Sequence, residues 1–533
     1  MEFREEGEVE PVSPTGQYLN SSILSVAILA VLEFELPIDD SQALSLLQDV
    51  FLPINPRFSS IMVSDNVDQK KQWKRVEVKL EDHVHVPIFP SKMSPESYDE
   101  YFDDYISNIA AEKLPQNRPL WEIHILKYPT SHAASTLIFK LHHALGDGYS
   151  LMGALLSCLQ TAQNPSVPLT FPSLKSSGPK TTRKTKTVSQ FFSSVFQTVS
   201  DFSWSILKSN FVEDDRTPIR SGEDGVEFRP ITLSTLTFSI DEIKLIKNKL
   251  GVTINDVIAG IIFLGTRIYM QEVTQKSSNE RCTALVLLRT RNINGYTSIK
   301  EMTQPNNAKM SWGNQFAFLH LPVPKSTETS NPLDFVWEAQ KMIKKKRSSA
   351  ASYLTGWLLD VLKKFRGPEG VARYIHGTLK NSSMTISNMI GPVEKMALDN
   401  QPVGGLYFMA VGAPQYIFFL QQSSYILVFF FRNGADRGTH SPVKVGMENP
   451  RYEYCGYEDG NGGKKLNRDG DGNGIPTPDS THCQSLFIYM GKLRVAFGAE
   501  KGFIDSQKLK ASMQNAFGVI LEASNPIPPA KAS

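Results

Sequence analysis

The stretch Ser135–Gly148, STLIFKLHHALGDG, decides how this chain is interpreted. Its first half is an apolar run with the length and composition of a buried β-strand. Its second half is a glycine-flanked turn, which the helical pattern YSLMGALLSCLQTA follows directly. Two adjacent histidines and an aspartate give the pattern H-H-x-x-x-D-G. Because an imidazole with its ordinary pKa of about 6.5 accepts a proton near neutral pH, the stretch predicts a general base at the end of a strand.

The alternation of side chains along this strand separates the two histidines. His143 shares a face with Phe139 and Leu141, and His142 lies on the opposite face. His143 is therefore beside an apolar surface, as expected for a base that works on an apolar substrate. Asp147 is placed to hold the turn through an arginine. The structural alternative is that the histidines merely end a strand and that Asp147 caps the next helix.

The bulk composition is that of a globular protein. Of its 533 residues, 41% are hydrophobic and 21% charged, and a net charge of +2 argues against nucleic acid as a partner. The four cysteines lack metal-ligand spacing, so we expect a reducing compartment and no metal. The apolar run Ile23–Phe34 follows an acidic segment and predicts a buried strand rather than a signal sequence.

The chain divides into two α/β halves. Residues 1–170 form the first, residues 171–229 a linker, and residues 230–533 the second. Residues 416–484 interrupt the second half with an apolar start and a long Gly-, Asn- and Asp-rich continuation, and we interpret them as a disordered insertion.

The linker combines a basic run with an amphipathic helix. Its first part, FPSLKSSGPKTTRKTK, carries five positive charges. Apolar residues then recur at helical spacing: Phe192, Val195, Phe196, Val199, Phe202 and Ile206. A basic run beside an apolar helical face suits an anionic membrane surface. Packing of this helix against its own protein is the alternative.

Four further segments accompany the histidine turn. They are EPVSPTGQYLNSS (Glu10–Ser22), RPLWE (Arg118–Glu122), TINDV (Thr253–Val257) and SNMIGP (Ser387–Pro392). In this order, with HHALGDG, they resemble the wax ester synthase/diacylglycerol acyltransferase family, the plant branch in particular. The resemblance covers almost the whole chain apart from the linker and the insertion. It implies an α/β fold of two chloramphenicol-acetyltransferase-like domains, each a mixed β-sheet flanked by helices, with an active-site tunnel between them.

The resemblance also implies an activity. The expected reaction is transfer of a long-chain fatty acyl group from acyl-CoA, a co-substrate, to a fatty alcohol or diacylglycerol, with no resident cofactor. In such proteins the second histidine, here His143, is the base. Gly148 belongs to the motif, and Asp147 pairs with an arginine on a strand of the other half. Arg291 is the first candidate for that arginine and Arg289 the second.

Three more residues are candidates for the site. Asn255 lies in the first turn of a helix that Thr253 can cap, where backbone N–H groups favour negative charge, so it is a candidate to stabilise the oxyanion. Plain capping is the alternative. Trp121 and His142 are candidates for substrate contact, and for Trp121 a place in the core is the alternative.

Two rival functions remain open. The first rival is an acyl-CoA-dependent acyltransferase for a non-lipid plant alcohol. Related plant enzymes with that activity carry a D-F-G-W-G motif, and this sequence lacks it. The second rival is an inactive lipid-binding relative, because the insertion separates Gly412–Gln415 from Ser485–Arg494, which would otherwise form neighbouring strands. For an active enzyme, the family and its lipid substrates predict the cytosolic face of the endoplasmic reticulum membrane, with the plasma membrane as a second location. Fatty alcohol and diacylglycerol both stay open as acceptors, as does the oligomeric state.

Overall fold

The structure is a computed structural model. It describes residues 10–41, 43–64, 71–164, 169, 188–226, 229–275, 279–289, 316–325, 331–347, 349, 351–390, 394–412, 416–422 and 492–526.

A seven-stranded sheet carries the histidine turn. Its order is β5-β6-β7-β2-β14-β13-β8. The strands are β2 (Ala27–Phe34), β5 (Val84–His85), β6 (Trp121–Leu126), β7 (Ser135–His142), β8 (Gln160–Thr161), β13 (Met396–Leu398) and β14 (Gln401–Val411). Every residue of β2 and β7 is buried, as their continuous apolar runs predict for strands covered on both faces. The strands predicted within Ile23–Phe34 and Ser135–His143 are thereby confirmed.

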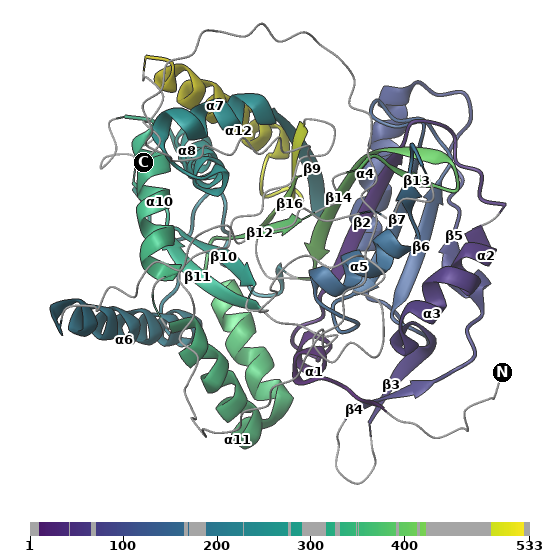
Figure 1. Ribbon diagram of the computed structural model, residues 1–533, viewed down its shortest axis with the longest axis horizontal. Helices are drawn as coiled ribbons and strands as arrows, with labels where there is room; N and C mark the ends of the chain where they lie inside the picture. Colours follow the sequence, from purple (N-terminus) through teal and green to yellow (C-terminus); the bar gives the residue numbers. More distant parts are fainter. Residues whose placement is uncertain are drawn as a thin grey trace, which may run out of the picture. The chain divides into compact units, whose positions relative to one another are not determined.

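The first sheet is completed by strands from the far half of the chain. β14 pairs antiparallel with β2 from Val403↔Phe34 to Val411↔Ala27, and β13 joins β14 to β8. The two sequence halves are therefore interleaved in space (Figure 1). An ion pair between Arg494 and Glu33 also links the second sheet to β2.

The second sheet has six strands in the order β11-β10-β12-β15-β16-β9. They are β9 (Ile231–Ser239), β10 (Thr283–Arg289), β11 (Phe316–Pro322), β12 (Met384–Ile390), β15 (Tyr416–Gln422) and β16 (Lys492–Glu500). β10, β12 and β15 run parallel, and the other pairs are antiparallel. A small third sheet contains β1 (Glu10–Pro11), β3 (Ser60–Ser64) and β4 (Lys71–Arg75). Two mixed sheets flanked by helices confirm the predicted fold class.

The place of β15 corrects the start of the predicted insertion. The composition predicts that a disordered insertion begins at Tyr416, whereas the backbone of Tyr416–Gln422 pairs with both β12 and β16. The apolar, β-prone letters YIFFLQQ suit a strand between two others. Residues 423–484 lie outside the described part of the chain.

Helices pack on the sheets and on one another. They are α1 (Pro14–Leu19), α2 (Ala43–Leu46), α3 (Leu52–Ile54), α4 (Pro95–Ala111), α5 (Gly148–Ser157), α6 (Val188–Asn210), α7 (Ile240–Leu250), α8 (Ile254–Thr274), α10 (Asp334–Arg347), α11 (Ala351–Lys380) and α12 (Ser506–Ser524). α8 packs between α10 and α12 in the core of the second sheet (Figure 1). Among the described helices it alone is long and apolar enough to cross a membrane, and 67% of its most apolar window is buried, as in a core helix.

Candidate active site

The turn after β7 sets the two histidines apart. His142 ends the strand with 1% of its surface exposed, whereas His143 is partly exposed. The backbone N–H of His143 donates to the carbonyl of Val26 at 2.8 Å, which ties the turn to the start of β2. The N–H of Leu145 donates back to the carbonyl of His142 at 3.0 Å. Of the pair, His143 is therefore the more exposed residue, although its Nδ1 is buried.

Both nitrogens of His142 bond to the protein. Nδ1 accepts the backbone N–H of Ala144 at 3.1 Å, so the neutral ring carries its proton on Nε2, which lies 3.2 Å from the Oγ of Ser25. Burial lowers the pKa of His142 to about 3, and nearby positive groups add to the effect. The ring is thus neutral at physiological pH and shapes the turn from inside, a place unlike that of a side chain that touches substrate.

Asp147 begins α5. Its carboxylate accepts the backbone N–H and the hydroxyl of Ser150, each at 2.9 Å, and Gly148 is the first residue of the helix. This is the capping role named as the structural alternative. Arg291, the predicted partner of Asp147, and the side chain of Arg289 lie outside the described residues, so that pairing stays a prediction.

An arginine that the sequence analysis missed supports the same turn. Arg57 is 5% exposed, and its Nη1 donates to the carbonyl of Leu145 at 3.2 Å. Its Nη2 pairs with Glu10 at 2.6 Å, and the guanidinium lies over the ring of Trp73 at 5.9 Å. No local pattern links Arg57 to a turn so far along the chain, although a lone arginine in the apolar run FLPINPRFSSIMV signals that a buried partner is needed.

The N-terminal segment packs on the turn as well. α1 begins after Ser13, whose hydroxyl accepts the N–H of Gly16. A Cβ at Gly16 would lie 3.2 Å from the carbonyl oxygen of Ala144, so the absence of a side chain there permits the close approach. The segment EPVSPTGQYLNSS thus has a physical role, because Glu10 pairs with Arg57, which supports the turn, and Gly16 lies against Ala144 of the turn itself.

Trp121 is a core residue. Its surface is 0% exposed, its indole N–H donates to the carbonyl of Phe58 at 2.8 Å, and its ring stacks on His83 with centroids 4.2 Å apart. The bonded N–H satisfies the only polar atom of the ring, as burial requires. The burial of Trp121 therefore favours its place in the core, the alternative to substrate contact.

Asn255 lies in the first turn of α8, as predicted. Thr253 and Asp256 form a reciprocal capping box: the hydroxyl of Thr253 accepts the N–H of Asp256 at 3.2 Å, and the carboxylate of Asp256 accepts the N–H of Thr253 at 2.8 Å. Since Asp256 is buried in this cap, the partly exposed Asn255 is the amide presented at the positive end of the helix. Its role toward an oxyanion stays a prediction.

Comparisons with known proteins agree with this geometry. Residues 51–258 match the wax ester synthase/diacylglycerol acyltransferase catalytic domain, and residues 312–440 match the C-terminal domain of the same proteins. The chain belongs to the wax ester synthase/diacylglycerol acyltransferase family. This membership confirms the predicted class of enzyme, an acyl-CoA-dependent O-acyltransferase.

The similarity extends over most of this acyltransferase. It is 31% identical to wax ester synthase/diacylglycerol acyltransferase 4 of Arabidopsis thaliana over 77% of the chain and 82% of the relative. It is 30% identical to wax ester synthase/diacylglycerol acyltransferase 11 of the same plant, over 77% of the chain and 87% of the relative. The wax ester synthase/diacylglycerol acyltransferase of Marinobacter aquaeolei VT8 has the same fold, with a TM-score of 0.54 at 12% identity, over 97% of this chain and all of that one.

A second solved structure widens the fold comparison. The first condensation domain of the CDA synthetase matches with a TM-score of 0.50 at 11% identity, over 98% of each chain. At such identities the likeness concerns the fold alone.

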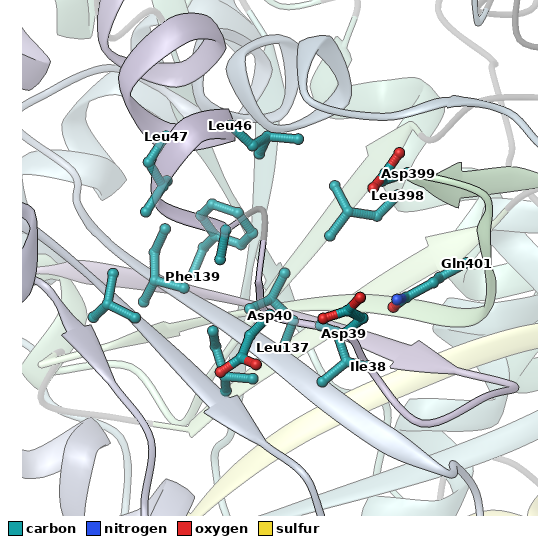
Figure 2. Close-up of a pocket in the computed structure, with 14 residues that line it drawn as sticks. Ile38, Asp39, Asp40, Leu46, Leu47, Leu137, Phe139, Leu398, Asp399 and Gln401 are labelled. Atoms are coloured by element: carbon teal, nitrogen blue, oxygen red, sulfur yellow. The ribbon is translucent and has the colours of Figure 1, made fainter.

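The acyltransferase also has an apolar pocket away from the turn. With about 520 Å³ of space, part of it open to solvent, it lies over the start of β7, between Leu137 and Phe139 on the strand and Leu46 and Leu47 on the helical segment opposite (Figure 2). Asp39, Asp40, Asp399 and Gln401 supply its polar lining. His143 does not line this pocket. The buried side chains of Trp121 and Leu141 fill the sheet face between His143 and the pocket. The pocket is therefore not the place of the expected proton transfer.

Proposed function

We propose that this acyltransferase moves a long-chain acyl group from acyl-CoA to the hydroxyl of a fatty alcohol or diacylglycerol, with His143 as the general base. One observation carries the assignment of the base: His143 is the partly exposed residue of the pair, whereas His142 is buried, neutral and bonded at both nitrogens. The names of the relatives, wax ester synthase/diacylglycerol acyltransferase, support the choice of acceptors.

The proposed reaction is a direct transfer. His143 takes the proton of the acceptor hydroxyl while that oxygen attacks the thioester carbonyl. A tetrahedral oxyanion forms, and the amide of Asn255, beside the positive end of α8, donates a hydrogen bond to it. The oxyanion then collapses, the carbon–sulfur bond breaks, and the imidazolium of His143 returns its proton to the departing thiolate. The products are an ester and free coenzyme A, and His143 is neutral again.

We place the enzyme at the cytosolic face of the endoplasmic reticulum membrane, with the plasma membrane as a second site. Both acceptors and the esters made from them are water-insoluble, which supports a membrane location. Acyl-CoA is water-soluble, so it reaches such a surface from the aqueous side. Coenzyme A enters as part of a co-substrate, and we expect no resident cofactor.

The test is thiol release from a long-chain acyl-CoA supplied with either hexadecanol or diacylglycerol. His143→Ala should lower kcat by about 10²–10⁴-fold. The matched control is His132→Ala, an exposed histidine outside the turn, which should keep full activity. Mass analysis of the ester identifies the acceptor. Full turnover by His143→Ala would remove the proposed base, and turnover only with a non-lipid alcohol would replace the proposed acceptors.

A further inference from the structure

The outward face of α6 is apolar. Between Phe196 and Phe211 the exposed large side chains are Phe196 (77%), Val199, Trp204, Leu207 and Phe211 (77%). Their spacing places them within one side of the helix and its last turn. The other exposed positions of this described stretch are Ser200, Ser203 and Asn210, so none of its exposed residues is charged. The two charged residues of the stretch, Asp201 and Lys208, have side chains that are 10% and 0% exposed.

The inward face of α6 makes polar contacts with α11. The hydroxyl of Ser209 lies 2.5 Å from that of Thr378, and Ser205 lies 3.4 Å from Tyr374, both partners being on α11. A Cβ at Gly377 would collide with the carbonyl oxygen of Ser209, so the two helix backbones approach closely. A helix that buries Ser205 and Ser209 while it exposes Phe196 and Phe211 departs from the usual pattern of a surface helix in water. Small residues at the contact and hydrogen bonds between hydroxyl groups are typical of helices that pack together in an apolar environment such as a membrane.

Salt bridges hold α6 in this orientation. Lys346 of α10 pairs with Asp201 at 2.6 Å. Lys208 pairs with Asp214 at 2.5 Å, and Asp214 also accepts the backbone N–H of Thr283 and the hydroxyl of Ser383. These bonds tie the middle of α6 to α10 and its end to Asp214, which in turn bonds to β10. Rotating the helix to bury its rings would therefore leave charges without partners.

Positive charge lies beside the apolar face. The end of α10, Lys341–Arg347, holds five basic residues and no acidic one, with Lys344 and Lys345 exposed. Gln197 of α6 donates to the carbonyl of Lys345 at 2.5 Å, so this basic end lies against α6 (Figure 1). α11, which packs on α6, exposes Trp357 and also Phe365 between two basic neighbours. Rings with adjacent lysines are what an anionic lipid surface attracts.

We propose that the exposed face of α6 (Phe196, Val199, Trp204, Leu207 and Phe211, here called the α6 ridge) docks on an anionic bilayer. The rings of the ridge enter the boundary between headgroups and acyl chains, while Lys344 and Lys345 meet the phosphates. The surface is independent of the histidine turn, so binding is measurable without turnover. The docking proposal rests on the proposed function only because both acyl acceptors dissolve in such a bilayer.

The experiment is flotation of the full chain with phosphatidylcholine vesicles, with and without phosphatidylserine. The double variant Phe196→Ser/Phe211→Ser should bind at least about 10-fold more weakly to both vesicles, because two exposed rings no longer enter the lipid. In Lys344→Ser/Lys345→Ser, binding to phosphatidylcholine vesicles should change little, and the increase in binding that phosphatidylserine causes should be lost. The matched control is Ile88→Ser/Phe503→Ser, which removes exposed apolar residues elsewhere and should bind as the parent does.

Two further measurements keep the proposal decidable. Lipids brominated in the acyl chain should quench the fluorescence of the parent more than that of Trp204→Phe, whether or not the serine variants behave well. Thiol release from detergent-solubilised substrates should be unchanged in the ridge variants, which separates this surface from the catalytic proposal. Equal vesicle binding by the parent and Phe196→Ser/Phe211→Ser would overturn the proposal. So would a dimer in light scattering that this variant dissociates, because the ridge would then be an interface between two copies.

Discussion

The Nη1 of Arg57 donates a hydrogen bond to the carbonyl oxygen of Leu145 at 3.2 Å, inside the turn that carries His143. The same guanidinium pairs with Glu10, so one buried side chain joins the N-terminal segment to the turn after β7. A planar guanidinium donates in several fixed directions at once, which a lysine cannot do. The position of His143 therefore depends on a residue that never needs to touch substrate.

Arg57→Lys should slow the enzyme without weakening substrate binding. The lysine keeps the charge opposite Glu10 but loses the fork, so the turn shifts, and we expect kcat to fall about 10- to 100-fold with little change in KM. Arg75→Lys, an exposed arginine on β4, is the matched control and should keep kcat. An unchanged kcat in Arg57→Lys, with a lower melting temperature, would make Arg57 a purely structural residue.

His142 should tolerate asparagine better than leucine. Asparagine offers an oxygen where Nδ1 accepts the N–H of Ala144, whereas leucine leaves that buried N–H without an acceptor. We expect kcat to fall less than about 10-fold in His142→Asn and about 10- to 100-fold in His142→Leu. Because the pKa of His142 is lowered to about 3, neither variant should move the pH profile of kcat/KM above pH 5 or so. A shifted profile would mean that His142 takes part in the proton transfer.

The buried pair Lys208–Asp214 should matter far more than its exposed neighbour. Asp214→Asn leaves the ammonium of Lys208 buried opposite a neutral amide, and we expect the free energy of unfolding to fall by about 3–5 kcal/mol. Asp215→Asn removes an exposed carboxylate that lies 3.4 Å from Arg281 and should cost at most about 1 kcal/mol. Chemical denaturation measures both. Equal losses in the two variants would contradict the buried placement of Lys208.

Acid should destabilise the fold through buried neutral histidines. Burial lowers the pKa values of His124, His142 and His320 to about 3, against about 6.5 when unfolded. The unfolded chain then binds more protons between these values, so stability is retained above pH 6.5 or so and falls as the pH drops toward 3. His320→Leu should reduce the proton uptake on unfolding at pH 5 by about one. His132→Leu, at an exposed site, should leave it unchanged.

Removing residues 416–484 should keep or improve the second sheet. The join would bring Gln415 to Ser485, and a two-residue turn at Gly491 and Lys492 would set Met490 opposite Leu493. Ile488 and Leu486 would then oppose Val495 and Phe497, whose present partners are Leu420 and Phe418. Since Leu493 is buried and is now paired with Gln422, an apolar partner suits that position better.

Thermal unfolding and thiol release of the shortened chain decide this prediction. A control that lacks only residues 423–484 keeps Tyr416–Gln422 and separates loss of the insertion from exchange of the strand. If removing 416–484 abolishes folding while the control folds, then Tyr416–Gln422 is the only segment that can form β15. An inert parent with an active shortened chain would support the rival function of a lipid binder disrupted by its insertion.

Local patterns predicted much of the fold. The apolar runs of β2 and β7 predicted buried strands because strand burial follows from the composition of a few consecutive residues. The start of α8 followed from Thr253, which caps the helix within one turn. In contrast, nothing in the sequence of β14 indicated that it would cross to the first sheet, because its pairing with β2 joins residues that are far apart in the chain.

The candidate site divides in the same way. The sequence by itself determined the strand, the histidine turn, the cap on α8 and, through the ordered segments, the family, since each depends on residues next to one another. Only the tertiary structure decided that His142 is buried beside Ser25, that Trp121 is core and that Arg57 supports the turn. Burial and partnership arise from contacts between distant segments, and those contacts exist only once the chain has closed the long loops between them.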